Sequence, residues 1–244
     1  MTTRLLLCLA LLCLGGVRMV PAQGLPTVVI DPGHGGTRDA GSDGAHDKST
    51  SNNATSVAHR LLEKDLTLLL GRLVAARVNA GGKLRAVLTR DADVNLDFAR
   101  RAAVAADARA VAWVSIHFNS DDGHRASGPR AVIQRQANNP NFDADKSFGL
   151  ALAGAVEGVS KRYRPQTPRA TWHDDHELHG QWGSYLFYQL NQNPATRMIP
   201  ACHLEVEFLD NADLEQTFFV DRRDEIFAAW AEAVARELER AVPR

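Results

Sequence analysis

Histidine and glutamate side chains recur in four short segments that lie far apart along this chain. The segments are Asp31-Pro32-Gly33-His34-Gly35-Gly36, Leu62-Glu63-Lys64-Asp65-Leu66, Ser115-Ile116-His117-Phe118-Asn119-Ser120 and His203-Leu204-Glu205-Val206-Glu207-Phe208. Imidazole nitrogens and carboxylate oxygens bind zinc, and a further carboxylate beside the metal can move protons. Two histidines, one glutamate ligand and a neighbouring glutamate are therefore the groups that metal-assisted hydrolysis requires.

Apolar runs place three of these segments at the ends of strands. Leu25 to Ile30, Val111 to Ile116 and Ile199 to Phe208 are apolar and strand-like, and His34 and His117 lie just past or at the end of the first two. Ligands of parallel α/β sheets collect at the carboxyl ends of the strands. Glu63 begins a helical pattern far from both histidines, so only the fold can join the three side chains.

The order of the remaining elements predicts the fold class. Strands are also expected at Leu84 to Thr89 and Ala131 to Ile133, and helices at Val57 to Asn79, Asn95 to Arg109, Phe148 to Val159 and Ile226 to Leu238. Strands that alternate with helices favour a parallel sheet covered on both faces. We therefore expect one α/β domain with a mostly parallel twisted sheet, helices on both faces, and a zinc site at the carboxyl ends of the strands.

The last strand alternates between polar and apolar residues. Side chains in a strand point to opposite faces in turn, so His203, Glu205 and Glu207 are predicted to share one face. Cys202 is predicted to lie on the other face as a small hydrophobic residue of the core. Buried carboxylates are costly unless a partner needs them, and a water bound to a metal would be such a partner.

The N-terminus predicts export. Arg4 precedes a short leucine-rich run, and Val20-Pro21-Ala22 provides small residues for cleavage before Gln23, so residues 1–22 are expected to be a signal peptide and 23–244 the catalytic domain. No wall-binding repeat is visible and no transmembrane segment is expected in the mature chain, which favours a soluble periplasmic enzyme over one tethered to a thick wall, with secretion as the alternative. With 28 Lys and Arg against 29 Asp and Glu, the nearly neutral chain gives no indication of a nucleic-acid partner.

Two polar segments interrupt the alternation of strands and helices. Residues 37–59 and 163–181 are predicted to be loop insertions, and the second contains His173, His176 and His179. The spacing of these three histidines favours a solvated loop or helix over a metal site. A lid over the zinc site is the alternative. The other histidines outside the four segments, His46, His59 and His124, are expected at the surface.

With these motifs, the chain resembles the zinc-dependent N-acetylmuramoyl-L-alanine amidases of the third amidase family, which cleave peptidoglycan. The matching motifs are residues 31–36, Glu-Lys-Asp at 63–65, Ser-Ile-His-Phe-Asn at 115–119 and Glu-Val-Glu-Phe-Leu-Asp-Asn at 205–211, and together they span nearly the whole mature chain. The motifs at 31–36 and 115–119 are specific in this order, whereas the other two are weak alone.

The resemblance implies a role for each site residue. His34, Glu63 and His117 would bind one zinc ion and leave a fourth position for water, and Glu205 would be the catalytic glutamate. The bond cut would join N-acetylmuramic acid to the L-alanine of the stem peptide, so peptidoglycan or muropeptides are the expected partners. Arg101 is a candidate match for an arginine of the family. The sequence does not indicate whether an activator protein is needed.

Two departures from the family keep alternatives open. Glu207 stands where the family usually has glycine, so either Glu205 or Glu207 could be the catalyst, and a non-catalytic zinc-containing wall-binding module is one alternative function. A zinc exopeptidase acting on free peptides is the other. The segment between His34 and Glu63 is also longer than is usual in the family, which would reshape the substrate groove or merely extend the surface.

Overall fold

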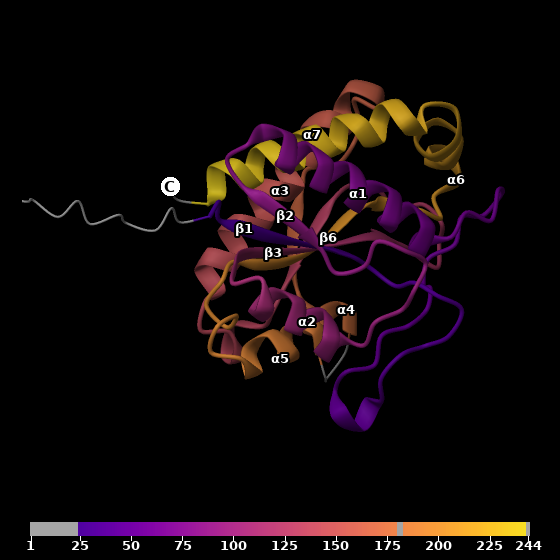
Figure 1. The fold of residues 1–244 in the computed structure, drawn as a ribbon. Coiled ribbons are helices and arrows are strands. Elements are labelled where there is room, and N and C mark those ends of the chain that lie inside the picture. Colours follow the sequence, from indigo (N-terminus) through magenta and orange to yellow (C-terminus); the bar gives the residue numbers. More distant parts are fainter. Residues whose placement is uncertain (1–23, 180–182, 243–244) are drawn as a thin grey trace, which may run out of the picture.

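The computed structural model describes residues 24–179 and 183–242 (Figure 1). The predicted signal peptide, residues 1–22, lies outside the described residues. Within the described ranges, no helix is both long and apolar enough to cross a membrane.

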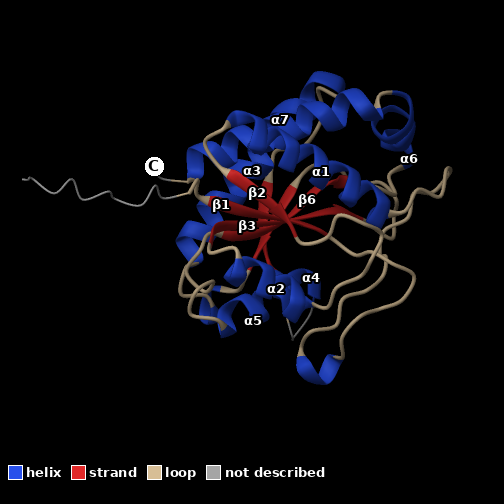
Figure 2. Ribbon diagram, viewed as in Figure 1, coloured by secondary structure: helices blue, strands red, loops and turns tan. Residues whose placement is uncertain are grey.

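A single six-stranded sheet runs through the centre of the described structure (Figure 2). Its strands, in spatial order, are β2 (Arg85–Leu88), β1 (Thr27–Pro32), β3 (Ala110–Asn119), β6 (Ala201–Phe208), β4 (Arg130–Ile133) and β5 (Thr171–Asp174). The first four strands are parallel, and β4 and β5 are parallel to each other, but β4 pairs with β6 in the antiparallel sense. The mostly parallel sheet predicted from the sequence is confirmed. The carboxyl ends of β1, β3 and β6 therefore meet at one end of the sheet, and those of β4 and β5 lie at the other.

Three long helices cover one face of the sheet: α1 (Glu63–Gly81), α3 (Phe142–Tyr163) and α7 (Arg223–Ala241). Alternate residues of the central strands, such as Val114, Ile116 and Phe118 of β3, enter the apolar core between the sheet and these helices. A short helix, α6 (Ala212–Leu214), and a π-helical turn, η4 (Glu215–Asp221), precede α7 and add Phe218 and Phe219 to the same core.

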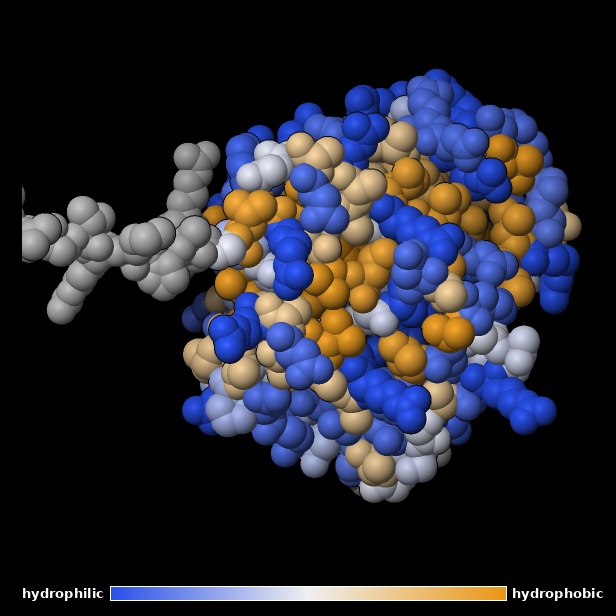
Figure 3. Space-filling model, in the orientation of Figure 1, coloured by the Kyte–Doolittle hydropathy of each residue, from blue (hydrophilic) through white to orange (hydrophobic). Residues whose placement is uncertain are grey.

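The opposite face has a smaller apolar cluster under α2 (Phe98–Asp107) and α5 (Tyr185–Gln192). Val29 and Trp113 point into this cluster from the strands, and Leu186 and Phe187 point into it from α5. Toward the carboxyl ends of the strands this face becomes polar, with buried Asp31, Ser115 and His117. Helices thus lie on both faces, as predicted. In the space-filling view, hydrophobic residues gather toward the middle of the visible face and hydrophilic residues cover most of its periphery (Figure 3).

The observed elements differ from the predicted ones at several boundaries, and helix α3, for example, begins at Phe142 and not at Phe148. Helix α1 begins at Glu63, not at Val57, because residues before it form an extended segment with a bridge between Thr55 and Leu62. Residues 163–181 were predicted to be a loop insertion but contain β5 and the short helix α4 (Asp175–His179). Helix α5 was not predicted. Residues 37–59 are mostly irregular, with one 3₁₀ turn, η1 (Asp43–Ala45). A second such turn, η2 (Gln136–Asn138), precedes α3.

Candidate metal centre and active site

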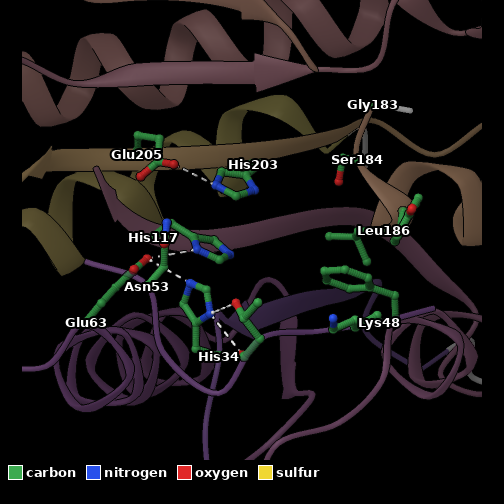
Figure 4. A pocket seen from close by; sticks show the side chains of 13 residues that line it. His34, Lys48, Asn53, Glu63, His117, Gly183, Ser184, Leu186, His203 and Glu205 are labelled. Carbon is green, nitrogen blue, oxygen red and sulfur yellow. Dashed lines mark hydrogen bonds and ion pairs between the residues drawn. The ribbon is translucent and has the colours of Figure 1, made fainter. Parts of the chain in front are cut away.

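The structure brings His34, Glu63 and His117 together at the carboxyl ends of β1 and β3 (Figure 4). One ligand atom from each lies within 4.8 Å of the others. Glu63 Oε1 is 3.2 Å from His34 Nε2 and 3.0 Å from His117 Nδ1. Glu63 is the first residue of α1, so the start of that helix carries the carboxylate over the strand ends.

Hydrogen bonds at the outer nitrogens fix which atoms the two histidines present to Glu63. His34 Nδ1 lies 3.0 Å from the carbonyl oxygen of Thr50, which can only accept, so Nδ1 carries a hydrogen and, in the neutral ring, Nε2 holds the lone pair. His117 Nε2 lies 3.1 Å from Ser115 Oγ, and that hydroxyl is 2.7 Å from Asp31 Oδ2. With Ser115 donating to Asp31, its oxygen accepts from His117 Nε2 and leaves the Nδ1 lone pair toward Glu63. Two lone pairs and a carboxylate oxygen then converge, which is an arrangement for a cation.

Burial and charge agree with this arrangement. Burial, together with the His203 and His34 rings, lowers the pKa of His117 to about 3, so the ring is a neutral ligand near pH 7. Burial opposes ionisation of Glu63, but the two histidines outweigh it and hold the pKa of Glu63 well below its usual range. Burial likewise opposes protonation of His34, and the neighbouring Glu63 carboxylate overcomes it and raises the pKa of His34. A positive charge is therefore favoured between these groups.

Backbone amides hold the Glu63 carboxylate in place. Ala54 N donates to Oε2 at 2.8 Å, and Phe118 N donates to Oε1 at 3.1 Å. Glu63 is 1% exposed, so these bonds replace the water that its charge would otherwise attract. The carboxylate is thus oriented by both the segment before α1 and the end of β3.

The turn that carries His34 has a strained backbone and a tight neighbour. His34 itself has a φ of 60°, which is uncommon for a residue with a side chain and costs on the order of 1–3 kcal/mol. A Cβ added to Gly33 would lie 2.2 Å from Cε1 of His117, so only glycine allows the His117 ring to lie against this turn. Strain and close contact at this position are consistent with a turn selected for its site rather than for stability.

A buried ion pair between Arg101 and Asp31 holds the turn that carries His34. Arg101 and Asp31 are each 1% exposed, and Arg101 Nη1 donates to Asp31 Oδ1 at 2.7 Å. Arg101 Nη2 also donates to the carbonyl oxygen of His34 at 2.8 Å. Burial would raise the pKa of Asp31, but Arg101, Thr89 and Ser115 outweigh burial and lower it. The candidate arginine of the sequence analysis therefore holds the turn and does not line the pocket.

Glu205 lies on β6, in register with His117 of β3. Its Oε1 is 2.9 Å from Nε2 of His203, and its buried Oε2 has no hydrogen-bond partner among the described residues. The ring of His203 stacks on the ring of His117, with 3.8 Å between ring centroids and 15° between the planes. His203 thus contacts both the candidate ligand and Glu205, a role that the sequence analysis did not assign.

Glu207 does not join the site, contrary to the prediction from strand alternation. The pairing of β3 with β6 shifts between His117 and Asn119, because Asn119 pairs with Phe208 and one extra residue enters β6. Glu207 Oε1 accepts hydrogen bonds from the backbone N–H groups of Gly128 and Phe208. Glu207 is 0% exposed, and burial raises its pKa to about 7.

The candidate ligands and Glu205 line one pocket of about 390 Å³. One wall comes from the 37–59 segment, with Lys48, Thr50 and Asn53, and another from the start of α5, with Ser184 and Leu186 (Figure 4). Two contacts tie these walls together. The His46 ring lies 5.1 Å from the Tyr185 ring, and Gln189 Nε2 donates to the His46 carbonyl oxygen at 2.9 Å. The long segment after His34 therefore shapes the pocket and is not mere surface.

In the 173–179 segment, His176 lies close to the pocket wall, because a Cβ added to the pocket-lining residue Gly183 would lie 3.0 Å from His176 Nε2. His173 ends near Glu177, with His173 Nδ1 2.8 Å from Glu177 Oε2, and neither His173 nor His176 lines the pocket. The side chain of His179 lies outside the described residues. His59 and His124 are exposed, as predicted, and His46 is half-buried against α5. Cys202 is fully buried in the core with Leu204 and Val206, also as predicted.

Comparison with known proteins agrees with the geometry. The family model described as N-acetylmuramoyl-L-alanine amidase matches residues 28–236. Over 102 residues, or 42% of the chain, the sequence is 34% identical to N-acetylmuramoyl-L-alanine amidase LytC of Bacillus subtilis, of which the match covers 17%. Over 144 residues, or 59% of the chain, it is 29% identical to N-acetylmuramoyl-L-alanine amidase AmiC of Escherichia coli, of which the match covers 27%. The chain therefore spans well under a third of the length of these relatives.

A solved structure with a similar fold covers almost the whole described chain. The catalytic domain of CwlV, an N-acetylmuramoyl-L-alanine amidase from Bacillus (Paenibacillus) polymyxa var. colistinus, superposes with a TM-score of 0.62 at 25% sequence identity. The superposition covers 88% of this chain and 96% of that domain. The single α/β domain is thus the size of a catalytic domain known on its own.

Proposed function

Because the chain belongs to the N-acetylmuramoyl-L-alanine amidase family, we propose that it hydrolyses the amide bond between N-acetylmuramic acid and L-alanine in peptidoglycan. The observation that carries this proposal is the convergence of His34 Nε2, His117 Nδ1 and Glu63 Oε1 beside Glu205 in one pocket. The proposed partner is peptidoglycan or its muropeptide fragments. The motifs at 31–36 and 115–119, which carry the resemblance in the sequence, contribute the two histidines.

Zinc is the metal that these residues fit. Two imidazole nitrogens and one carboxylate oxygen are the ligand set of catalytic zinc sites, which keep a further position open. Both histidines have their outer nitrogens hydrogen-bonded, as metal-binding histidines generally do. When bound, the ion would supply a Lewis acid that polarises the scissile carbonyl and lowers the pKa of water.

Glu205 is the residue that we assign to proton transfer. Its Oε2 is buried, has no hydrogen-bond partner among the described residues and belongs to a residue that lines the pocket. Placed there, Glu205 would take a proton from the attacking water and deliver it to the departing amide nitrogen of L-alanine. Glu207 is not suited to this role, since its carboxylate is bound to backbone amides outside the pocket lining.

The proposal can be tested with purified protein and isolated sacculi. We expect the wild type to bind about one zinc per chain and to release stem peptides with a free N-terminal L-alanine, which mass spectrometry identifies. Glu205→Gln should keep its zinc and lose turnover by roughly 10²–10⁴-fold. Absence of turnover in the zinc-loaded wild type would identify a wall-binding module, and release of terminal amino acids from free peptides would identify an exopeptidase. Neither alternative is favoured by the structure.

We propose that the protein is exported and acts outside the cytoplasmic membrane. The substrate lies outside the cytoplasmic membrane, and the order of charged, apolar and small residues in 1–22 predicts a signal peptide. We therefore infer that residues 23–244 act in the periplasm. N-terminal sequencing of the protein recovered from a periplasmic extract would test this inference, with Gln23 expected as the first residue.

A further inference from the structure

We propose that His203 is a positioning residue that fixes the Glu205 carboxylate for the proposed hydrolysis and leaves Oε2 of Glu205 as the proton-accepting oxygen. The proton-transfer part of this inference rests on the proposed function. The positioning part rests on the contacts that His203 makes with Glu205 and His117.

The first contact is the hydrogen bond between the two side chains on β6. His203 Nε2 lies 2.9 Å from Glu205 Oε1, and residues two apart in a strand share a face. A carboxylate oxygen accepts, so Nε2 of His203 donates. Both residues are nearly buried, at 6% and 8% exposed, where a charge-assisted hydrogen bond holds a side chain more firmly than in solvent.

The second contact joins His203 to the candidate metal ligand. The rings of His203 and His117 are stacked with 3.8 Å between centroids, and β3 and β6 are adjacent parallel strands. His117 is itself held by Ser115 and Glu63. The stack therefore gives the His203 ring a fixed surface, and through it Glu205 acquires a fixed position relative to the ligands (Figure 4).

The consequence is a distinction between the two oxygens of Glu205. Oε1 is occupied by His203, whereas Oε2 has no hydrogen-bond partner among the described residues although it is buried. A buried carboxylate oxygen without a partner is costly, which is consistent with an oxygen kept for a substrate group or a reacting water. If Glu205 rotated about its side-chain torsions, this distinction would be lost.

Two substitutions separate the hydrogen bond from the ring stack. His203→Phe keeps an aromatic ring that can lie on His117 but has no N–H to donate. His203→Gln loses the ring but keeps an N–H donor at a similar reach. His124→Phe is the matched control, because His124 Nδ1 also contacts a carboxylate, Asp210 Oδ2 at 2.9 Å, but on the exposed loop that follows β3.

We expect kcat of His203→Phe on muropeptides to fall by roughly 10–100-fold, as when a group that orients a site residue is removed, while KM and zinc content stay near wild type. His203→Gln should retain kcat within about fivefold of the wild type. A crystal structure of the Phe variant should show the Glu205 carboxylate turned from its wild-type position, and His124→Phe should change none of these values.

Three results would overturn the inference: full kcat in His203→Phe, equal losses of kcat in the Phe and Gln variants, or loss of zinc in both. The last would mean that His203 supports the metal ligands and not Glu205. Failure of the proposed function is a separate result, because the zinc-loaded wild type would then show no hydrolysis. In that case, crystal structures of His203→Phe and His203→Gln still decide whether His203 positions Glu205, because only the Phe variant should show the Glu205 carboxylate turned.

Discussion

The two faces of strand β3 have opposite chemistry although their residues alternate along one short segment. Val114, Ile116 and Phe118 point into the apolar core under α1, α3 and α7. Ser115 and His117 point to the other face, where they meet Asp31, Glu63 and His203. The first face stabilises the fold by removing apolar surface from water, whereas the second buries groups that would be solvated in the unfolded chain.

This difference indicates how the sheet accommodates a charged site. Polar groups at the carboxyl end of β3 contact groups from other elements: Glu63 at the start of α1 accepts from Phe118 N, and His203 of β6 stacks on His117. The apolar face supplies the stability that offsets the cost of this arrangement. Substitutions on the two faces should therefore separate function from stability.

The largest expected effect comes from the polar face, with Glu63→Gln. The amide has nearly the same shape, but it removes the negative charge between the His34 and His117 rings and places an N–H where an acceptor is needed. We expect zinc to be lost and hydrolysis to fall by about 10³-fold or more, since metal catalysis contributes several kcal/mol. Zinc analysis and dye release from sacculi measure both. A Gln variant with full zinc and full rate would contradict the assignment of Glu63.

The matched substitution on the apolar face is Phe118→Ala. The Phe118 ring lies next to the rings of Phe219, Phe227 and Trp230, with centroid distances of 5.5, 5.7 and 6.3 Å. Removing it should lower the free energy of unfolding by about 3–5 kcal/mol. The molecules that remain folded should keep wild-type kcat. Urea denaturation and assays at low temperature test the two parts, and a loss of kcat without a loss of stability would show that the faces are not separable.

The sequence was informative where local pattern and chemistry coincide. Apolar runs located the central strands to within a few residues, and the glycine-rich turn and the strand-end histidine identified His34 and His117 as candidates. Cys202 was placed correctly by alternation because β6 is regular up to Glu205. The strands, the two histidines and the burial of Cys202 could be predicted because each depends on residues close to it in the sequence.

The features that were missed depend on partners distant in sequence. Ser56 donates to Glu215, 159 positions away, and the bridge between Thr55 and Leu62 holds the segment before α1 extended, so helical periodicity alone placed the start of α1 too early. The extra residue in β6 that removes Glu207 from the pocket depends on pairing with β3. The stack of His203 on His117 likewise requires the strand order of the sheet, which no local pattern contains.

Glu207→Gln tests whether a carboxylate buried outside the site is a cost to the fold. Burial raises the pKa of Glu207 from 4.5 to about 7, although the N–H groups of Phe208 and Gly128 oppose the shift. Between these pH values the unfolded chain has released this proton while the folded chain retains it, so wild-type stability falls as pH rises through this window. The shift corresponds to roughly 3 kcal/mol at 1.36 kcal/mol per pKa unit.

Glutamine keeps an oxygen that can accept both N–H groups but cannot ionise. We therefore expect Glu207→Gln to match the wild type near pH 4 and to exceed its stability above pH 7 by up to about 3 kcal/mol. Urea denaturation of both proteins across this range measures the difference. A difference that does not depend on pH would show that Glu207 ionises normally in the folded protein.

The smallest expected effect tests how closely the two histidine-bearing segments must approach. A Cβ at Gly33 would lie 2.2 Å from Cε1 and 2.4 Å from Nε2 of His117, so Gly33→Ala must displace that ring from Ser115 and Glu63. We expect zinc affinity, measured by competition with a chelator, to fall by roughly 10–100-fold, as it does when groups that orient a metal ligand are disturbed. Gly154→Ala is the control, because nothing lies within 4 Å of its added Cβ in the middle of α3. That control should leave zinc affinity unchanged and stabilise the helix by about 0.5–1 kcal/mol.

Equal zinc affinities in the two variants would mean that the His117 ring can move without cost, and that the polar face of β3 is less tightly packed than its apolar face.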